Sequence, residues 1–186
     1  MTTTESRPVW ERRINDTVRW GLKRWLLFAN LVVLVYGGLP WLSPIAHAAG
    51  YRTLGNLLFA LYTPLCHQKP SQSFFLNGYQ VAVCQREAIM YGARFAGGLL
   101  FALFRHQVRA MPVRLGALLL LPMLIDGGSQ LIDDLLGGTL LRGTNDDIGS
   151  FNFWMRMATG LLFAIAVLLV VYPRLERDLR QAQIAA

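Results

Sequence analysis

Four apolar stretches of about 20 residues each constrain this chain more than any other feature. They run from about 25 to 46, 84 to 104, 115 to 136 and 154 to 172. An α-helix rises 1.5 Å per residue, so roughly 20 apolar residues cross a hydrocarbon core about 30 Å thick. The sequence therefore predicts an all-α, polytopic transmembrane helix bundle with four spans. The second and third stretches fit only if their polar residues face the bundle interior.

A shortage of charge supports lipid as the main solvent of the chain. Hydrophobic residues make up 54% and charged residues 16%, against roughly 25% charged residues in soluble domains. The formal net charge of +7 would suit nucleic acid or an anionic membrane surface. Because the basic residues flank the apolar stretches and no nucleic-acid-binding signature occurs, the membrane interpretation is favoured and no nucleic acid partner is predicted.

A fifth apolar run, from Leu54 to Leu65, is too short to span the membrane. It predicts a short re-entrant or interfacial helix. With four spans and the N-terminus inside, the cytoplasmic segments are 1–24, 105–114 and 173–186. They hold six, three and three of the eighteen Lys and Arg residues. The positive-inside rule therefore predicts a multi-pass plasma membrane protein with both termini in the cytoplasm.

The chain divides into a cytoplasmic basic segment (1–24), a transmembrane bundle (25–172) and a cytoplasmic tail (173–186). In the basic segment, apolar residues alternate with arginines at loosely helical spacing. This pattern predicts an N-terminal amphipathic helix on anionic lipid headgroups. A solvated basic flank explains the imperfect periodicity equally well. The tail is predicted to be a short helical extension.

Ionisable residues inside the predicted spans form a polar constellation. Arg94 lies in the second span, while Asp126 and Gln130 lie one turn apart on one face of the third. Counting the helical rise from each surface places Arg94 and Asp126 at similar depths. Two hypotheses follow. Arg94 and Asp126 form a buried pair that neutralises both charges, or they line a polar site with Gln130 that opens to the outer face.

The only two cysteines, Cys66 and Cys84, both fall on the predicted outer side. An external pair of cysteines is a candidate disulfide. Alternatively, Cys66, His67 and Cys84 could bind zinc or another transition metal, with a carboxylate or water completing the coordination. A pair of free thiols with redox chemistry is the third alternative.

The segment before the fourth span carries further polar residues, including Arg142, Asn145 and Asn152, and Arg156 follows near the outer end of the span. Arg156 could extend its side chain to the headgroup region. It could also bind a phosphate group, since the guanidinium suits that geometry. Arg86, at the start of the second span, is a candidate for holding the same anion.

Several short motifs occur between residues 60 and 165. They are Leu65-Cys66-His67-Gln68-Lys69-Pro70, Gly78-Tyr79-Gln80, Val83-Cys84-Gln85-Arg86, Asp126-Gly127, Gln130 and Arg156 with Thr159-Gly160. This pattern resembles a family of small prokaryotic predicted membrane proteins that is known only as a domain of unknown function. The resemblance implies that the Cys-His-Gln segment, Asp126, Gln130 and Arg156 belong to one shared site. It implies no particular activity.

Three functions are compatible with these residues. The first is an enzyme acting on a lipid or isoprenoid, with Asp126 or His67 as acid or base. The second is a small-solute or ion transporter or channel with a site near the midplane. The third is an accessory subunit of a larger membrane complex, or a homo-oligomer. The sequence slightly favours a ligand-binding or catalytic site, whose predicted ligand-binding residues are Gln68, Arg86, Arg94, Gln130, Asn152 and Arg156.

Overall fold

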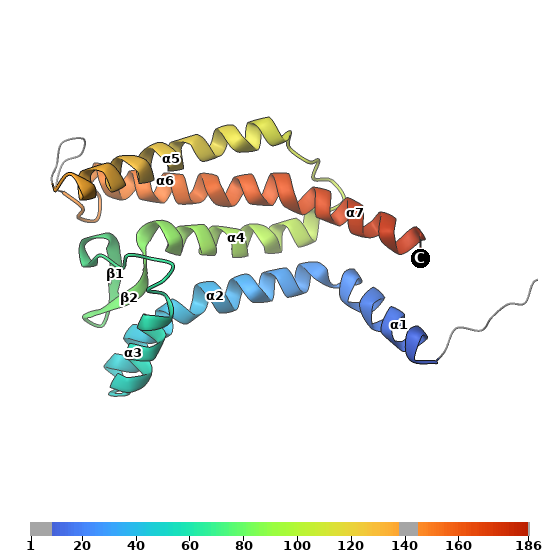
Figure 1. Cartoon of the computed structure of the whole chain (residues 1–186), viewed down its shortest axis with the longest axis horizontal. Helices are drawn as coiled ribbons and strands as arrows, with labels where there is room; N and C mark the ends of the chain where they lie inside the picture. The colour runs from blue at the N-terminus through green and yellow to red at the C-terminus, as the bar shows by residue number, and fades with distance from the viewer. Residues whose placement is uncertain (1–8, 138–144, 186) are drawn as a thin grey trace, which may run out of the picture.

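Four long helices form the bundle of this protein, which a computed structural model describes for residues 9–137 and 145–185 (Figure 1). They are α2 (Trp25–Ala48), α4 (Gln85–Phe104), α5 (Val113–Leu135) and α6 (Phe151–Ala166). Helix α4 packs against α2 and α6, and α6 also packs against α5. Among the described residues, α2, α4, α5 and the continuous helix that begins with α6 and runs from Phe151 to Gln183 are long and apolar enough to cross a membrane. The predicted all-α bundle with four spans is confirmed.

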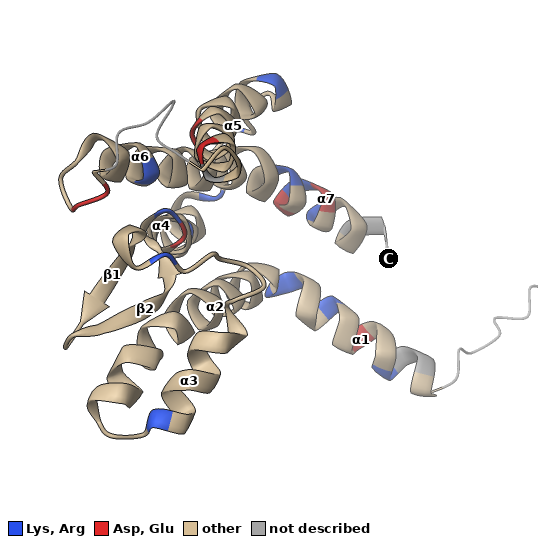
Figure 2. Ribbon diagram, turned by 60° about the vertical axis from the view of Figure 1, so that its left-hand side comes forward, with Lys and Arg blue, Asp and Glu red and all other residues tan. Residues whose placement is uncertain are grey.

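The two ends of the bundle differ in structure (Figure 1). One end carries the short helix α3 and a β-hairpin, and it is called the hairpin end below. The opposite end carries α1 (Val9–Lys23), α7 (Tyr172–Ala185) and the C-terminus. The predicted N-terminal helix is thus confirmed as a helix, although residues 1–8 lie outside the described residues. Basic side chains recur along α1, as Figure 2 shows.

The short apolar run forms α3 (Arg52–Leu61), which folds back against α2. Ten residues rise only about 15 Å, half the thickness of a hydrocarbon core. Polar contacts fix the reversal, because Ser43 Oγ donates to the Gly55 carbonyl at 2.9 Å. His47 Nε2 also lies 3.0 Å from Asn56 Oδ1. The prediction of a short helix in place of a fifth span is confirmed.

A β-hairpin that the sequence analysis did not predict joins α3 to α4. Its strands are β1 (Ser73–Leu76) and β2 (Tyr79–Cys84), paired antiparallel. Asn77 and Gly78 have φ values of 53° and 80°, as a two-residue hairpin turn with two left-handed residues requires. Three consecutive residues of β2 are buried against α2 and Tyr62. They are Val81, Ala82 and Val83. The hairpin is therefore anchored to the bundle.

The last helix continues without a break past the predicted end of the fourth span. A π-helical segment, Val167–Val171, links α6 to α7, so one helix runs from Phe151 to Gln183. A π-helix turn loosens the regular hydrogen-bond ladder. Met111 N donates to the Leu169 carbonyl at 2.9 Å, and Arg174 Nη2 donates to the Met111 carbonyl at 2.8 Å. These two contacts tie the last helix to the loop before α5.

Candidate functional site

A cavity of about 240 Å³ lies at the hairpin end, between the loop after α3, the start of α4, and α5. Of the residues predicted for the site, its lining includes Cys66, His67, Gln68, Cys84, Arg86, Gln130 and Arg156. Three other predicted residues, Arg94, Asp126 and Asn152, do not line it. The structure therefore brings most of the predicted set together, from segments up to 90 positions apart in the sequence.

Arg86 is the centre of the polar contacts on one side of the cavity. Its Nη2 forms an ion pair with Asp126 Oδ2 and donates to Gln130 Oε1 at 3.2 Å. The Asp126 side chain is fully buried and also accepts a hydrogen bond from Thr159 Oγ1 at 3.4 Å. Helix α6 comes close to α4 here, because a Cβ at Gly160 would lie 2.5 Å from the Arg86 carbonyl oxygen. The pair thus ties together α4, α5 and α6.

The buried partner of Asp126 differs from the one suggested by the sequence. Arg94 lies eight residues beyond Arg86 on α4, about 12 Å deeper in the bundle. Its Nε is buried and has no hydrogen-bond partner among the described residues. The hypothesis of an Arg94–Asp126 pair is therefore corrected to an Arg86–Asp126 pair. The stagger of α5 against α4, which brings Asp126 level with the start of α4, explains the change.

Arg156 binds a loop within the protein and does not extend outward into the headgroup region. Its side chain is 1% exposed. Nε donates to Gln85 Oε1 at 3.1 Å, and Nη1 forms an ion pair with Asp146 Oδ1 at 2.8 Å. Asn152 Nδ2 reaches the same carboxylate oxygen at 3.2 Å, and Gln72 Nε2 reaches the other at 3.0 Å. Asp146 therefore joins the loop before the hairpin to the start of α6.

The charge of Asp146 is stabilised by these contacts. Partial burial alone would raise its pKa, but the hydrogen bonds from Arg156, Gln72 and Asn152 and the Arg156 charge outweigh burial. The pKa of Asp146 therefore lies below its ordinary value. Asp146 was not among the predicted site residues. Arg142, which was considered beside it, lies outside the described residues.

Gln68 uses its side chain to position the cavity wall. Its Nε2 donates to the carbonyls of Phe59 and Ala82, both at 2.8 Å, while its Oε1 accepts from Thr63 Oγ1 at 3.0 Å. Its backbone has a φ of 49°, in the left-handed region that non-glycine residues rarely adopt. These bonds hold the Cys66–Gln68 loop between α3 and β2. A ligand-binding role for the Gln68 amide stays a prediction.

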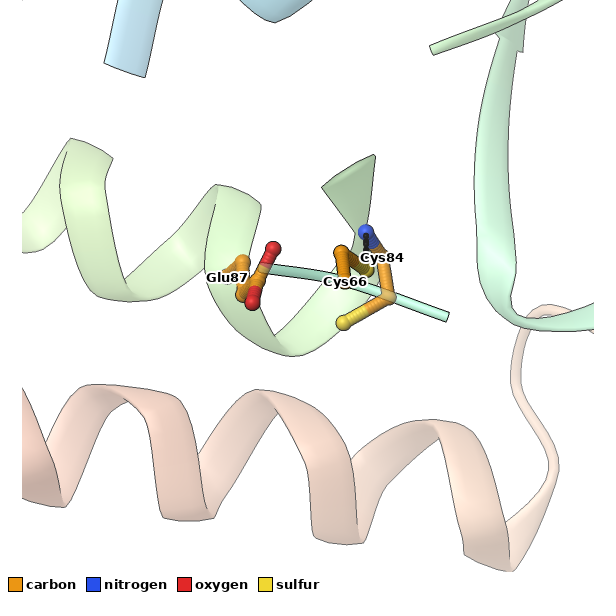
Figure 3. A group of neighbouring side chains, drawn as sticks. All are labelled: Cys66, Cys84 and Glu87. Carbon is orange, nitrogen blue, oxygen red and sulfur yellow. Dashed lines mark hydrogen bonds between the residues drawn. The ribbon is translucent and has the colours of Figure 1, made fainter. Parts of the chain in front are cut away.

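Both cysteines carry free thiols and lie side by side at the junction of β2 and α4 (Figure 3). Cys84 N donates to Cys66 Sγ at 3.2 Å. The contact between the thiols lowers the pKa of Cys84 to about 6 and raises the pKa of Cys66, because a second thiolate would form beside the first. The pair thus favours one thiolate near neutral pH.

Glu87 is the functional candidate that the sequence analysis missed. Its carboxylate and the two thiols lie within 4.8 Å of one another, and all three residues line the cavity (Figure 3). His67 lines the cavity but is exposed and does not belong to this group of donors. The spacing of Cys84 and Glu87, three residues apart at the start of a helix, places both on one face and is a signal readable in the sequence.

Two hydrogen-bond donors on the lining residues lack an acceptor within the described part of the chain. Arg86 Nε and Gln130 Nε2 are both buried, and neither has a hydrogen-bond partner among the residues that the structure describes. Leaving such a group unpaired costs about 1–3 kcal/mol, and more where the group is charged. The site is therefore suited to an acceptor supplied from outside the chain.

Comparisons with known proteins identify relatives without an assigned activity. An uncharacterised protein of Methanocaldococcus jannaschii, MJ1492, is 26% identical over 159 residues, which cover 82% of this chain and 93% of that protein. An uncharacterised protein of Methanothermobacter thermautotrophicus is 33% identical over 78 residues, which cover 42% of this chain and 70% of that protein. No solved structure matches the chain. The family described as "Predicted membrane protein (DUF2085)" matches residues 66–170, from the first cysteine to the π-helical segment, and this chain belongs to that family.

Proposed function

We propose that this membrane protein binds the phosphate group of a ligand in the cavity at the hairpin end. The observation that carries the proposal is the pair of buried donors without a partner among the described residues, Arg86 Nε and Gln130 Nε2. Phosphate oxygens accept several hydrogen bonds at once, and arginine binds them well. Lys69 and Arg156 also line the cavity and add positive charge to its walls.

Carboxylates hold both guanidinium groups in the wall of the cavity. Asp126 pairs with Nη2 of Arg86, which leaves Nε of Arg86 without a partner among the described residues. Arg156 donates to Gln85 and Asp146 from all three of its nitrogens, so its contribution is positive charge. A preorganised site of this kind spends less free energy on ordering its side chains when the ligand arrives.

The size and position of the cavity favour a headgroup over a whole lipid. Its volume of about 240 Å³ lies below the roughly 300–1,000 Å³ of sites that enclose drug-sized molecules. It lies beside the first turn of α4, where a spanning helix meets the interface, and Met90 and Met123 form part of its lining. A phosphate could enter while acyl or isoprenoid chains remain in lipid. The distribution of Lys and Arg favours the outer leaflet.

Catalysis on such a lipid is an extension of this proposal. His67 lines the cavity and is exposed, so it could reach a bound ligand. Asp126 is fully buried behind Arg86 and does not line the cavity, which favours a positioning role over direct acid–base chemistry. Transport is less favoured, because a cluster of apolar side chains packs between the helices nearer the opposite end: Leu26, Phe101, Leu168 and Tyr172.

A variant that replaces the donor with an acidic group tests the proposal. Gln130→Glu keeps an oxygen acceptor for Arg86 Nη2 but replaces the unpartnered N–H donor with a carboxylate oxygen. We expect affinity for phosphate-bearing ligands to fall roughly 10- to 150-fold, the effect of losing one charge-assisted hydrogen bond of about 1.5–3 kcal/mol. Binding of inorganic phosphate, short-chain phosphatidylglycerol and short-chain diacylglycerol would be measured by calorimetry in detergent.

Gln107→Glu is the matched control, since it makes the same change at an exposed position in the loop after α4, away from the hairpin end. The proposal predicts that this control binds like the wild type and that diacylglycerol binds neither protein measurably. Tighter binding of phosphatidylglycerol than of inorganic phosphate would identify a lipid ligand, and the reverse would identify a soluble one. Equal phosphate affinity in the wild type and Gln130→Glu would contradict the proposal.

A further inference from the structure

Three side-chain donors that could hold a metal ion meet at the start of α4 (Figure 3). Cys84 is the last residue of β2, and Glu87 lies in the first turn of the helix that follows. Cys66 comes from a different segment, the loop after α3, where its N–H donates to the Tyr62 carbonyl at 2.9 Å. We propose that Cys66, Cys84 and Glu87 bind a zinc ion whose fourth coordination position opens into the cavity.

The distances between the donors suit a tetrahedral ion. Zinc bonds of about 2.3 Å to sulfur and about 2.0 Å to oxygen place the ligand atoms roughly 3.5–3.8 Å apart. In the structure the three donor atoms lie within 4.8 Å of one another without an ion. A contraction of at most about 1.3 Å would form the site, which side-chain rotation can supply.

Two further features of this cluster point to a cation. Glu87 Oε2 is buried and has no hydrogen-bond partner among the described residues, although a buried carboxylate oxygen normally has one. The Cys84 N–H donates to Cys66 Sγ at 3.2 Å, the kind of bond that stabilises negative charge on a sulfur atom. The N-terminus of a helix also favours thiolates. The protein therefore places two thiols and a carboxyl group at one point, and a bound cation would favour their deprotonated forms.

The donor set selects the class of ion. Thiolates favour zinc, copper(I) and iron–sulfur clusters, while magnesium and calcium take oxygen ligands alone. A carboxylate beside two thiolates favours the divalent zinc ion over copper(I). Three protein ligands with an open fourth position are typical of reactive zinc sites, whereas structural sites use four. The cavity lined by all three residues would supply a water molecule or a ligand oxygen.

The wild-type protein provides the first test. Protein purified in detergent with reductant and without chelator should contain about one equivalent of zinc by elemental analysis. After chelation, cobalt(II) should bind with a thiolate-to-metal charge-transfer band, and zinc should displace it. Both thiols should resist alkylation with zinc and react after its removal. The proposal would be overturned by a protein that contains no metal and whose two thiols are freely alkylated. It would also be overturned by thiols that become reactive only after reduction of a disulfide.

Variants then assign the ligands. Cys66→Ser and Cys84→Ser should each reduce the charge-transfer band, and Glu87→Gln should weaken zinc binding by at least roughly 10-fold while keeping the band. His67→Ala is the matched control, because His67 is adjacent to Cys66 but outside the donor group. Its zinc affinity should match the wild type. An equal loss in His67→Ala and Glu87→Gln would overturn the assignment of Glu87. These measurements need no phosphate, so they are independent of the proposed function.

Discussion

The buried Arg86–Asp126 pair permits a quantitative prediction about stability. The Asp126 side chain is 0% exposed and the Arg86 side chain 15% exposed. Removing one partner of a buried pair costs about 3–5 kcal/mol, because the other charge stays buried. Arg86→Leu leaves the carboxylate without its guanidinium, so we expect it to reach this range. Asp126→Leu leaves Arg86 beside Gln130 and the cavity, so we expect a smaller loss of about 2 kcal/mol.

The double variant distinguishes a true pair from two independent packing effects. With both charges replaced by leucine, no buried charge remains, and such replacements are often close to neutral. Arg86→Leu with Asp126→Leu should therefore be more stable than Arg86→Leu alone. The free energies of unfolding would be measured in mixed micelles of SDS and a mild detergent. A coupling of at least about 1.5 kcal/mol is expected for contacting residues.

Arg105→Leu is the control for the loss of an arginine. Its guanidinium lies 3.8 Å from Glu176 and is 36% exposed, so the pair should contribute less than about 1 kcal/mol. Additive losses in the double variant, or a loss in Arg86→Leu no larger than in Arg105→Leu, would refute the assignment of Arg86 as the partner of Asp126.

Three further predictions concern the loop, the hairpin and the topology. The pKa of Asp146 is lower in the folded protein than in the unfolded chain. The charge of Asp146 therefore contributes fully to the free energy of unfolding above the unfolded-state pKa of about 4, and this contribution is lost as the pH falls through the lower folded-state pKa. The stability difference between wild type and Asp146→Asn should thus be present at pH 7 and shrink in acid; a constant difference would contradict this reasoning. Gly78→Ala, at a φ of 80°, should lose about 1 kcal/mol of unfolding free energy, while the helical Gly128→Ala should not. Reporter fusions at the C-terminus should be active in the cytoplasm, and an insertion at the hairpin turn should be accessible only from outside; the reverse labelling would invert the predicted topology.

The sequence predicts the bundle well because lipid imposes a simple length rule. Each spanning helix needs about 20 apolar residues, and the twelve-residue run at Leu54–Leu65 falls clearly short. The β-hairpin could also have been predicted, since Asn77-Gly78 is a strong signal for a two-residue hairpin turn. The flanking residues give a weaker signal, because three consecutive residues of β2 are buried and the alternation typical of a half-buried strand is absent.

The contacts within the site were harder to predict than the identity of the residues that form it. Helical rise gives the depth of a residue only if both helices begin at the same level. Helix α5 continues nine residues beyond Asp126, about 14 Å, so Asp126 meets Arg86 near the start of α4 and not Arg94. This stagger depends on packing between distant segments. Glu87 and Asp146 each have a partner nearby in the sequence, Cys84 and Arg156, but other members of each group, Cys66 and Gln72, come from distant segments.

The central claim is that Gln130 and Arg86 donate hydrogen bonds to a phosphate at the hairpin end. Solid-state NMR of the protein in phospholipid bilayers tests it directly, with glutamine side chains labelled with ¹⁵N. A hydrogen bond of roughly 2.7–3.2 Å to a phosphate oxygen places nitrogen and phosphorus on the order of 4 Å apart. The ¹⁵N signal of Gln130 is assigned by its absence in Gln130→Glu. This signal should lose intensity through coupling to ³¹P, either of the lipid or of added inorganic phosphate. A Gln130 signal that is unaffected by ³¹P in both samples would contradict the claim.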